Sequence, residues 1–234
     1  MARIARCLTV LPNFSVHKMW RSHDKEFNLR TNEQKAKYLD FMNEDLESKK
    51  YEQGAELNVM TLMSSHEHGM FRIISQILFS KHMQRVHSRY GAFFNRLMGR
   101  RGKVAVDRPK TCLIADYQHE LNAAHYIHAN PVRAGIVKDA KDYFWSTYRL
   151  YAFGMRERWM RNIVFPAWYL NLAKNSLLRQ RNYRRAYAAY LKRTENRKQH
   201  FLHKLFYGPV QWTCTMKKTL NEARDAKKDD QNTS

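Results

Sequence analysis

A predicted β-hairpin is the feature that most constrains the fold of this chain. From Leu57 to Met63 every second residue is apolar or β-branched, which is the period of a half-buried strand. Two serines then favour a turn, and a second strand follows from His66 to Ile74. We therefore expect these two strands to pair as an antiparallel hairpin.

The other expected elements precede and follow this hairpin in the sequence. In order, they are a strand from Pro12 to Trp20, a helix from about Thr31 to Ser48, the hairpin, a helix from Ser75 to Met98, a strand from Thr111 to Ala115 and a helix from Tyr117 to Ala129. Pro131 disfavours helical geometry at Asn130, so the last helix should stop there. This order predicts an α+β fold: a ferredoxin-like antiparallel sheet with helices on one face.

The composition indicates a globular protein with a polyanionic partner. The chain is 44% hydrophobic, and its net charge of +21 favours nucleic acid first and an anionic membrane surface second. No run approaches the roughly 18 apolar residues of a transmembrane helix, and the N-terminus lacks the apolar core of a signal peptide. Three widely spaced cysteines (Cys7, Cys112 and Cys214) are typical of a reducing cytosol and not of disulfides.

The character of the sequence changes after Gly154. From Tyr151 onward it contains 18 Lys or Arg and 6 Asp or Glu, so this part carries more than half of the net charge. We expect a domain over residues 1–154, a basic helical extension over 155–220 and a disordered tail over 221–234. The extension is interpreted as DNA-binding surface, with a basic module for another partner as the alternative.

Two short segments could together form a site. His66 and His68 lie one residue apart and would share a strand face, while Tyr126 and Asn130 lie four apart and would share a helix face. Imidazole binds Mn, Co, Ni or Zn well and Mg less so, and an asparagine oxygen could complete the shell. If the two faces meet, a metal ion would lie beside a tyrosine nucleophile.

Each of these residues also has an ordinary interpretation. With 11 histidines and 13 tyrosines in the chain, a His-x-His pair arises easily by chance and a tyrosine is usually a packing residue. An asparagine before a proline is commonly a cap or turn residue. HExxH is absent because Glu67 lies between the histidines, which disfavours a zincin protease.

Three segments in this order resemble the single-tyrosine HUH transposases, and in particular the bacterial REP-associated tyrosine transposases. The segment from Tyr126 to Gly135 matches the family pattern YIxxNPVRAG, and His66-x-His68 follows Leu62-Met63 as the family's histidine pair follows LMPN. Residues 142–148 resemble its DYPWSSY segment. The similarity covers about residues 14–154.

The resemblance implies an HUH nuclease that cuts single-stranded DNA, often beside a hairpin, and leaves a 5′-phosphotyrosine and a free 3′-OH. His66 and His68 would bind a divalent ion, Mg²⁺ or Mn²⁺, Asn130 would be its third ligand, and Tyr126 would be the nucleophile. It further implies a bacterial cytoplasmic, nucleoid-associated protein without a membrane partner, acting as a monomer or homodimer on hairpin-containing single-stranded DNA.

Basic and aromatic side chains would contact the DNA. Bases would stack on aromatics such as Tyr90, Phe93 or those of the extension, while cations track the phosphates. The candidate cations are Lys81, Arg85, Arg89, Arg96, Arg100, Arg101, Lys103 and Arg133.

The chain departs from the family pattern at three places. Glu67 occupies a position that is usually apolar, and a carboxylate there must be paired, rim-exposed or adjusting the metal. Residues 104–110 lack the family's LWQxRFK pattern, and the basic extension lies outside the shared domain. Two rivals therefore stay open: a non-catalytic nucleic-acid-binding relative, favoured by Glu67, and an RNA-recognition-type module, disfavoured because an RNP1-type aromatic segment is missing.

Overall fold

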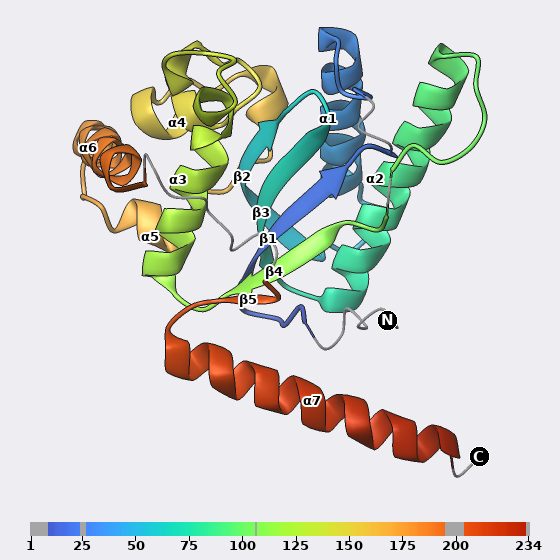
Figure 1. Ribbon diagram of the computed structural model, residues 1–234. Coiled ribbons are helices and arrows are strands. Elements are labelled where there is room, and N and C mark those ends of the chain that lie inside the picture. Colours follow the sequence, from blue (N-terminus) through green and yellow to red (C-terminus); the bar gives the residue numbers. More distant parts are fainter. Residues whose placement is uncertain (1–8, 24–26, 106, 195–203, 233–234) are drawn as a thin grey trace.

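The computed structural model describes residues 9–23, 27–105, 107–194 and 204–232 (Figure 1). Its first seven elements are β1 (Ser15–Arg21), α1 (Asn32–Glu47), β2 (Ala55–Leu62), β3 (His66–Ile73), α2 (Gln76–Leu97), β4 (Lys110–Ile114) and α3 (Tyr117–Arg133). Their type and order are those predicted. Thr31 caps α1 as expected, because its hydroxyl accepts from Gln34 N and its N–H donates to Gln34 Oε1.

The five strands form one sheet in the order β2-β3-β1-β4-β5. All neighbours are antiparallel except β4 and β5 (Phe206–Tyr207), which are parallel. The first four strands have the order of a ferredoxin-like sheet, so the predicted α+β class is confirmed.

The sequence predicts helices on one face of the sheet. In the structure, helices cover both faces. Side chains of α1 and α2 contact the face that carries Lys18 and Trp20, whereas Tyr126 of α3 contacts the face that carries His17 and His68 (Figure 1). Both faces have apolar residues to bury, because the central strands read as nearly continuous buried runs.

Helix α3 passes through Pro131 and ends at Arg133, four residues beyond the predicted end at Ala129. Pro131 has no N–H for the carbonyl of Ile127, and the Asn130 side-chain amide donates to that carbonyl at 3.4 Å. The helix then closes with paired bonds from Gly135 N to Val132 O and from Ile136 N to Pro131 O, with Gly135 at φ 67°.

The basic extension packs directly on the sheet domain. The predicted extension over residues 155–220 contains a 3-10 turn at Arg158–Met160, α5 (Ala167–Leu170), α6 (Ser176–Thr194), β5 and the start of α7 (Val210–Asn232). The 3-10 turn at Ala140–Asp142 and α4 (Tyr148–Phe153) precede it in the chain. Residues 221–232, expected to be disordered, form the second half of α7 instead. Alanine and lysine, which both favour helix, each occur twice in this stretch.

No helix among the described residues is long and apolar enough to cross a bilayer. Cys112 is buried, Cys214 is exposed and both are free thiols, while Cys7 lies outside the described residues.

Candidate functional site

The two predicted site segments meet at the centre of the molecule. In the β1–β3 register, Arg21 pairs with His66 and Met19 pairs with His68, so these side chains share one sheet face. Helix α3 lies over that face (Figure 1), and the ring of its Tyr126 contacts that of His68. The ring centroids of His66 and His68 are 4.8 Å apart, and those of His68 and Tyr126 are 5.7 Å apart.

A third histidine, which sequence reasoning missed, completes this group. His17 of β1 places its Nε2 3.0 Å from Nδ1 of His68, and its ring centroid is 6.1 Å from that of Tyr126. His17 belonged to a predicted strand, but its neighbours depend on strand register, which local pattern does not give. A polar residue inside that strand was the only available signal.

In each of the two histidines predicted as ligands, the Nδ1 atom contacts a neighbouring side chain. Nδ1 of His66 lies 3.0 Å from Ser65 Oγ, and Nδ1 of His68 contacts His17. The other nitrogen of His68, Nε2, is buried and has no hydrogen-bond partner. A buried polar atom without a partner needs an explanation, and an ion bound there would supply one.

Burial keeps all three imidazoles neutral at pH 7. It lowers the pKa of His66 to about 4 and that of His17 to about 3, with smaller lowering effects from Arg21 and Lys18 respectively. Burial also lowers the pKa of His68 well below its usual value. Neutral imidazoles can present the lone pairs that a divalent ion requires, so His66 and His68 fit a metal site.

Among the described residues, an acidic, cysteine or histidine side chain would not complete a metal site at His66 and His68. Within the described ranges, no three His, Cys, Asp or Glu side chains form a group that could hold a metal ion. Asn130 donates its amide nitrogen to the carbonyl of Tyr126 at 2.9 Å. Its nitrogen is thus committed to the helix, and its oxygen is the atom that could bind an ion.

The Tyr126 hydroxyl is protonated in this environment. Burial raises its pKa to about 12, while Arg133 and a hydrogen bond from the Asn130 side chain oppose the shift. The Arg133 guanidinium lies 5.8 Å from the Tyr126 ring centroid and also donates to Thr194 Oγ1 at 2.5 Å. A cation so placed stabilises negative charge near the hydroxyl.

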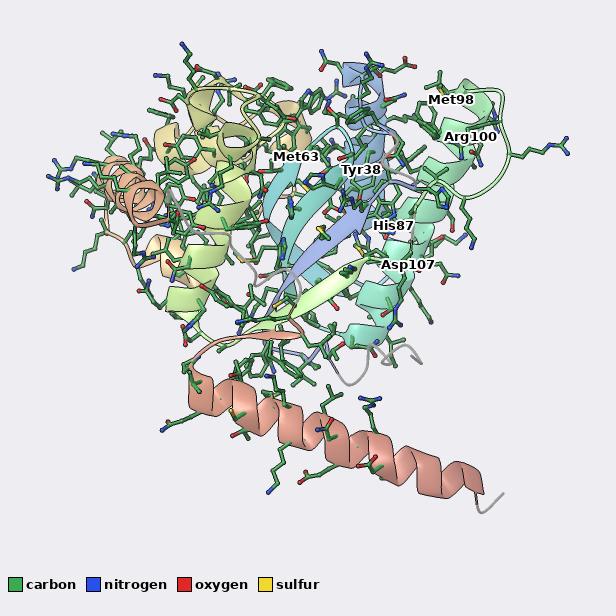
Figure 2. All side chains as sticks on the ribbon, in the orientation of Figure 1. Tyr38, Met63, His87, Met98, Arg100 and Asp107 are labelled. Carbon is green, nitrogen blue, oxygen red and sulfur yellow. The ribbon has the colours of Figure 1, made fainter. Side chains whose placement is uncertain are left out.

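Glu67 lies on the opposite face of the sheet. Its Oε2 is 2.6 Å from Lys18 Nζ, with both side chains fully buried, and it accepts a hydrogen bond at 3.3 Å from Tyr38, which Figure 2 labels. Burial raises the pKa of Glu67, whereas Lys18 and Tyr38 oppose that shift. Of the three expectations for this residue, pairing is therefore correct, and Glu67 neither reaches the rim nor faces the histidines.

Most of the predicted DNA-binding cations lie far from Tyr126. All except Arg133 belong to α2 or to the loop after it, on the other side of the sheet (Figure 2 labels Arg100). Arg85 and Arg89 are held in ion pairs with Asp45 and Glu44 of α1. The exposed members are Lys81, Arg89, Arg96, Arg101, Lys103 and Arg133, although Arg89 is engaged by Glu44.

Sequence reasoning missed Arg21, whose register partner is His66 and whose charge lowers the pKa of that histidine. The register and the ring contacts thus place Arg21 beside His66 and Arg133 beside Tyr126. As for His17, local pattern could not place Arg21, because its neighbours depend on the register of β1.

The proposed stacking aromatics are mostly in the core. Tyr90 is fully buried against Trp20 and Tyr38, and the α6 tyrosines at positions 183, 187 and 190 are also buried. They are not available to bases, and only Phe93 of those named stays partly exposed.

The α6 tyrosines instead fix the extension to α3, the helix that carries Tyr126. His128 of α3 contacts the Tyr183 hydroxyl through Nδ1 at 2.6 Å and Thr147 Oγ1 through Nε2 at 2.8 Å. The His125 ring packs 5.0 Å from that of Tyr183 and 5.4 Å from that of Tyr190. The extension therefore packs against α3 and fixes its position.

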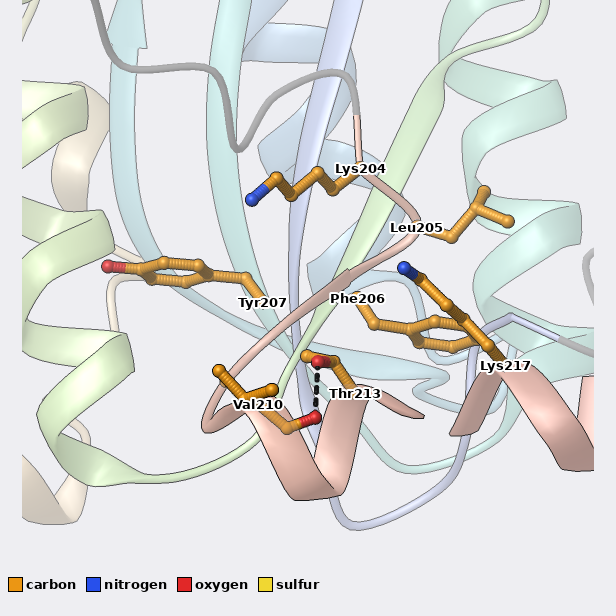
Figure 3. Close-up of a pocket in the computed structure, with 8 residues that line it drawn as sticks. Lys204, Leu205, Phe206, Tyr207, Val210, Thr213 and Lys217 are labelled. Atoms are coloured by element: carbon orange, nitrogen blue, oxygen red, sulfur yellow. Dashed lines mark hydrogen bonds between the residues drawn. The ribbon is translucent and has the colours of Figure 1, made fainter. Parts of the chain in front are cut away.

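A groove between β5 and α7 adds positive surface to the extension (Figure 3). Lys204 and Lys217 line it beside Tyr207, and Thr213 Oγ1 donates to the carbonyl of Val210 at 2.8 Å. Its lysines are surface residues, so the groove contributes charge without defining a ligand site.

The sequence matches no family model and no curated protein. Three solved chains match it. One is a REP-associated tyrosine transposase bound to a REP hairpin, with a TM-score of 0.51 and 17% identity over 63% of this chain and 84% of that chain. At this identity the match shows a shared fold and a distant structural relationship.

Proposed function

We propose that this protein is a metal-dependent single-stranded DNA endonuclease and strand transferase of transposase type, with Tyr126 as its nucleophile. The observation that carries the proposal is the shared face of His66, His68 and Tyr126, on which Nε2 of His68 is buried without a partner. The fold that this chain shares with a hairpin-bound tyrosine transposase also supports it.

The Tyr126 oxygen would attack a backbone phosphorus. A new P–O bond to tyrosine forms, the P–O3′ bond breaks, and the phenolic proton passes through solvent to the departing 3′ oxygen. A divalent ion, Mg²⁺ or Mn²⁺, on His66, His68 and the Asn130 oxygen would supply Lewis-acid stabilisation of charge on the phosphate oxygens. The 5′-phosphotyrosine keeps the phosphodiester energy, so another 3′-OH can be joined later, as DNA transposition or recombination requires.

Positive charge would hold the DNA strand over this face. Arg21 and Arg133 lie beside it, and the net charge of +21 supplies long-range attraction to phosphates. Hairpin-containing single-stranded DNA is the proposed substrate because the solved neighbour carries a REP hairpin.

The binding-only alternative loses its main argument. It depended on Glu67 disturbing the histidine pair, yet Glu67 is paired with Lys18 on the other face. The alternative now depends on the third ligand, because Asn130 is the only candidate for it among the residues named here.

Incubation with Mn²⁺ and end-labelled DNA containing an imperfect hairpin tests the proposal. We expect a covalent protein–DNA band from the wild type and none from Tyr126→Phe, which should still bind DNA. Tyr117→Phe is the matched control, because Tyr117 is on the same helix and 50% exposed. A band retained in Tyr126→Phe would exclude this nucleophile, and DNA binding without any band across varied hairpins would favour the binding-only alternative.

A further inference from the structure

We propose that His17 is a positioning residue, which holds His68 in the tautomer that leaves a lone pair on Nε2. The inference rests on the proposed metal site and assigns a role to a residue outside the predicted motif. His17 would act through His68 and would not itself bind the ion.

The contact between the two rings has the geometry of a hydrogen bond in the ring plane. His17 Nε2 and His68 Nδ1 are 3.0 Å apart, and the rings are within 16° of parallel. Both side chains are buried, so water does not compete for this contact. One nitrogen must carry the proton and the other must accept it.

The surroundings favour a proton on Nδ1 of His68. If His17 donated instead, a neutral His68 would carry its proton on Nε2, where a buried N–H has no acceptor. A buried donor without an acceptor is costly and rare in proteins. With the proton on Nδ1, the atom left unpaired is a lone pair, which a cation can satisfy.

His66 is prepared in the same sense by a different partner. The Ser65 hydroxyl lies 3.0 Å from its Nδ1 and can accept a proton from it, which leaves Nε2 as the ligand atom. Each proposed ligand thus has its Nδ1 engaged by a neighbour. The Nε2 atom of His17 contacts Nδ1 of His68, so it is not available to an ion bound by His66 and His68. This agrees with the absence of a three-histidine metal group among the described residues.

Two variants of the full chain separate this role from simple packing. His17→Phe keeps an aromatic ring but removes the acceptor, whereas His17→Gln keeps an acceptor oxygen. The control is His119→Ala, because His119 is a half-buried histidine near the start of α3 whose ring contacts Asp116 and Tyr207. Thermal unfolding of each variant confirms that it is folded before the measurements.

The first measurement is long-range ¹H–¹⁵N correlation NMR of the metal-free protein at pH 7.5, with His68 assigned from His68→Ala. We expect the Nδ1–H tautomer in wild type and His17→Gln, and an Nε2–H population in His17→Phe. The second is calorimetric titration with MnCl₂, in which His17→Phe should bind about 10- to 100-fold more weakly, as for other residues that orient metal ligands.

An Nε2–H tautomer of His68 in the wild type would overturn the inference, as would His17→Phe with unchanged tautomer and affinity. If the tautomers follow the prediction but the wild type binds no Mn²⁺, the role of His17 stands and the metal-dependent function fails. The two failures are therefore distinguishable.

Discussion

The two faces of the β1–β3 pair differ sharply although they are built from neighbouring residues. His17 and His68 point to α3, where neutral imidazoles surround Tyr126 and one nitrogen is unpaired. Lys18 and Glu67, next to them in the chain, point to α1 and α2. There they form a buried ion pair with each other, and Tyr38 donates a hydrogen bond to Glu67. Strand alternation thus separates a face with reactive potential from a face that holds the fold together.

This difference predicts which property each substitution will change. Variants on the face toward α3 should lose chemistry while the protein stays folded. Variants on the face toward α1 and α2 should lose stability, and the protein that remains folded should keep its chemistry.

The largest effect is expected from removing both proposed ligands. The double substitution His66→Ala, His68→Ala should raise the activation free energy of adduct formation by several kcal/mol. The rate of adduct formation should therefore fall on the order of 10³- to 10⁴-fold. DNA affinity should change little, because phosphate contacts dominate it. Adduct yield and a binding titration measure the two quantities, and a normal adduct yield would remove the histidine pair from the mechanism.

The next effect belongs to the other face. Glu67→Ala should lower the free energy of unfolding by about 3–5 kcal/mol, because it leaves Lys18 buried without its partner. Lys18→Met combined with Glu67→Leu should recover most of that loss, since an apolar pair needs no desolvation of charge. Urea unfolding measures both variants. A loss below about 1 kcal/mol in Glu67→Ala would contradict the assigned structural role, by comparison with exposed pairs.

The layer that contains α3 should also be acid-sensitive. Burial lowers the pKa of His125 to about 3, so between pH 6.5 and 3 the unfolded chain binds a proton there that the folded protein does not. As the pH decreases across this window, the free energy of unfolding should decrease by about 1.4 kcal/mol per pH unit for each such histidine.

His125→Phe tests this account, because phenylalanine fits among tyrosines and removes a nitrogen that is buried without a partner. We expect unfolding stability at pH 7 within about 1.5 kcal/mol of wild type, as for volume-conserving core changes. The stability–pH slope should decrease by one proton. An unchanged slope would show that His125 does not set the acid response.

The smallest effect compares cations on the two sides of the sheet. Arg133→Gln should lower the salt dependence of single-stranded DNA binding by about 0.7 in log–log slope, the value for one lost phosphate contact. Arg96→Gln, an exposed cation of α2, should change the slope less. Equal changes would restore α2 to the DNA-binding surface that the sequence predicted.

Local pattern was sufficient for the elements and for part of the site. The alternation before His66 and the helical spacing around Tyr126 predicted the strand and helix that carry the site. The cap at Thr31 was also predictable, because all of its hydrogen bonds lie within four residues.

The remaining features depend on contacts between distant segments. His17 joins the site and Lys18 neutralises Glu67 only through the β1–β3 register, which spans about fifty residues of sequence. The tyrosines of α6 resemble a nucleic-acid surface in sequence because they alternate with arginines. They are buried because α6 packs against His125 and His128 of α3.

Peptide mapping of the covalent adduct tests the central claim most directly. After reaction with Mn²⁺ and hairpin DNA, nuclease and protease digestion would leave a nucleotide-modified peptide for mass spectrometry. The account predicts a 5′-phosphate linkage on Tyr126, in the wild type and in the Lys18→Met, Glu67→Leu variant alike. A nucleotide on another residue, or bound DNA without any modified peptide, would contradict it.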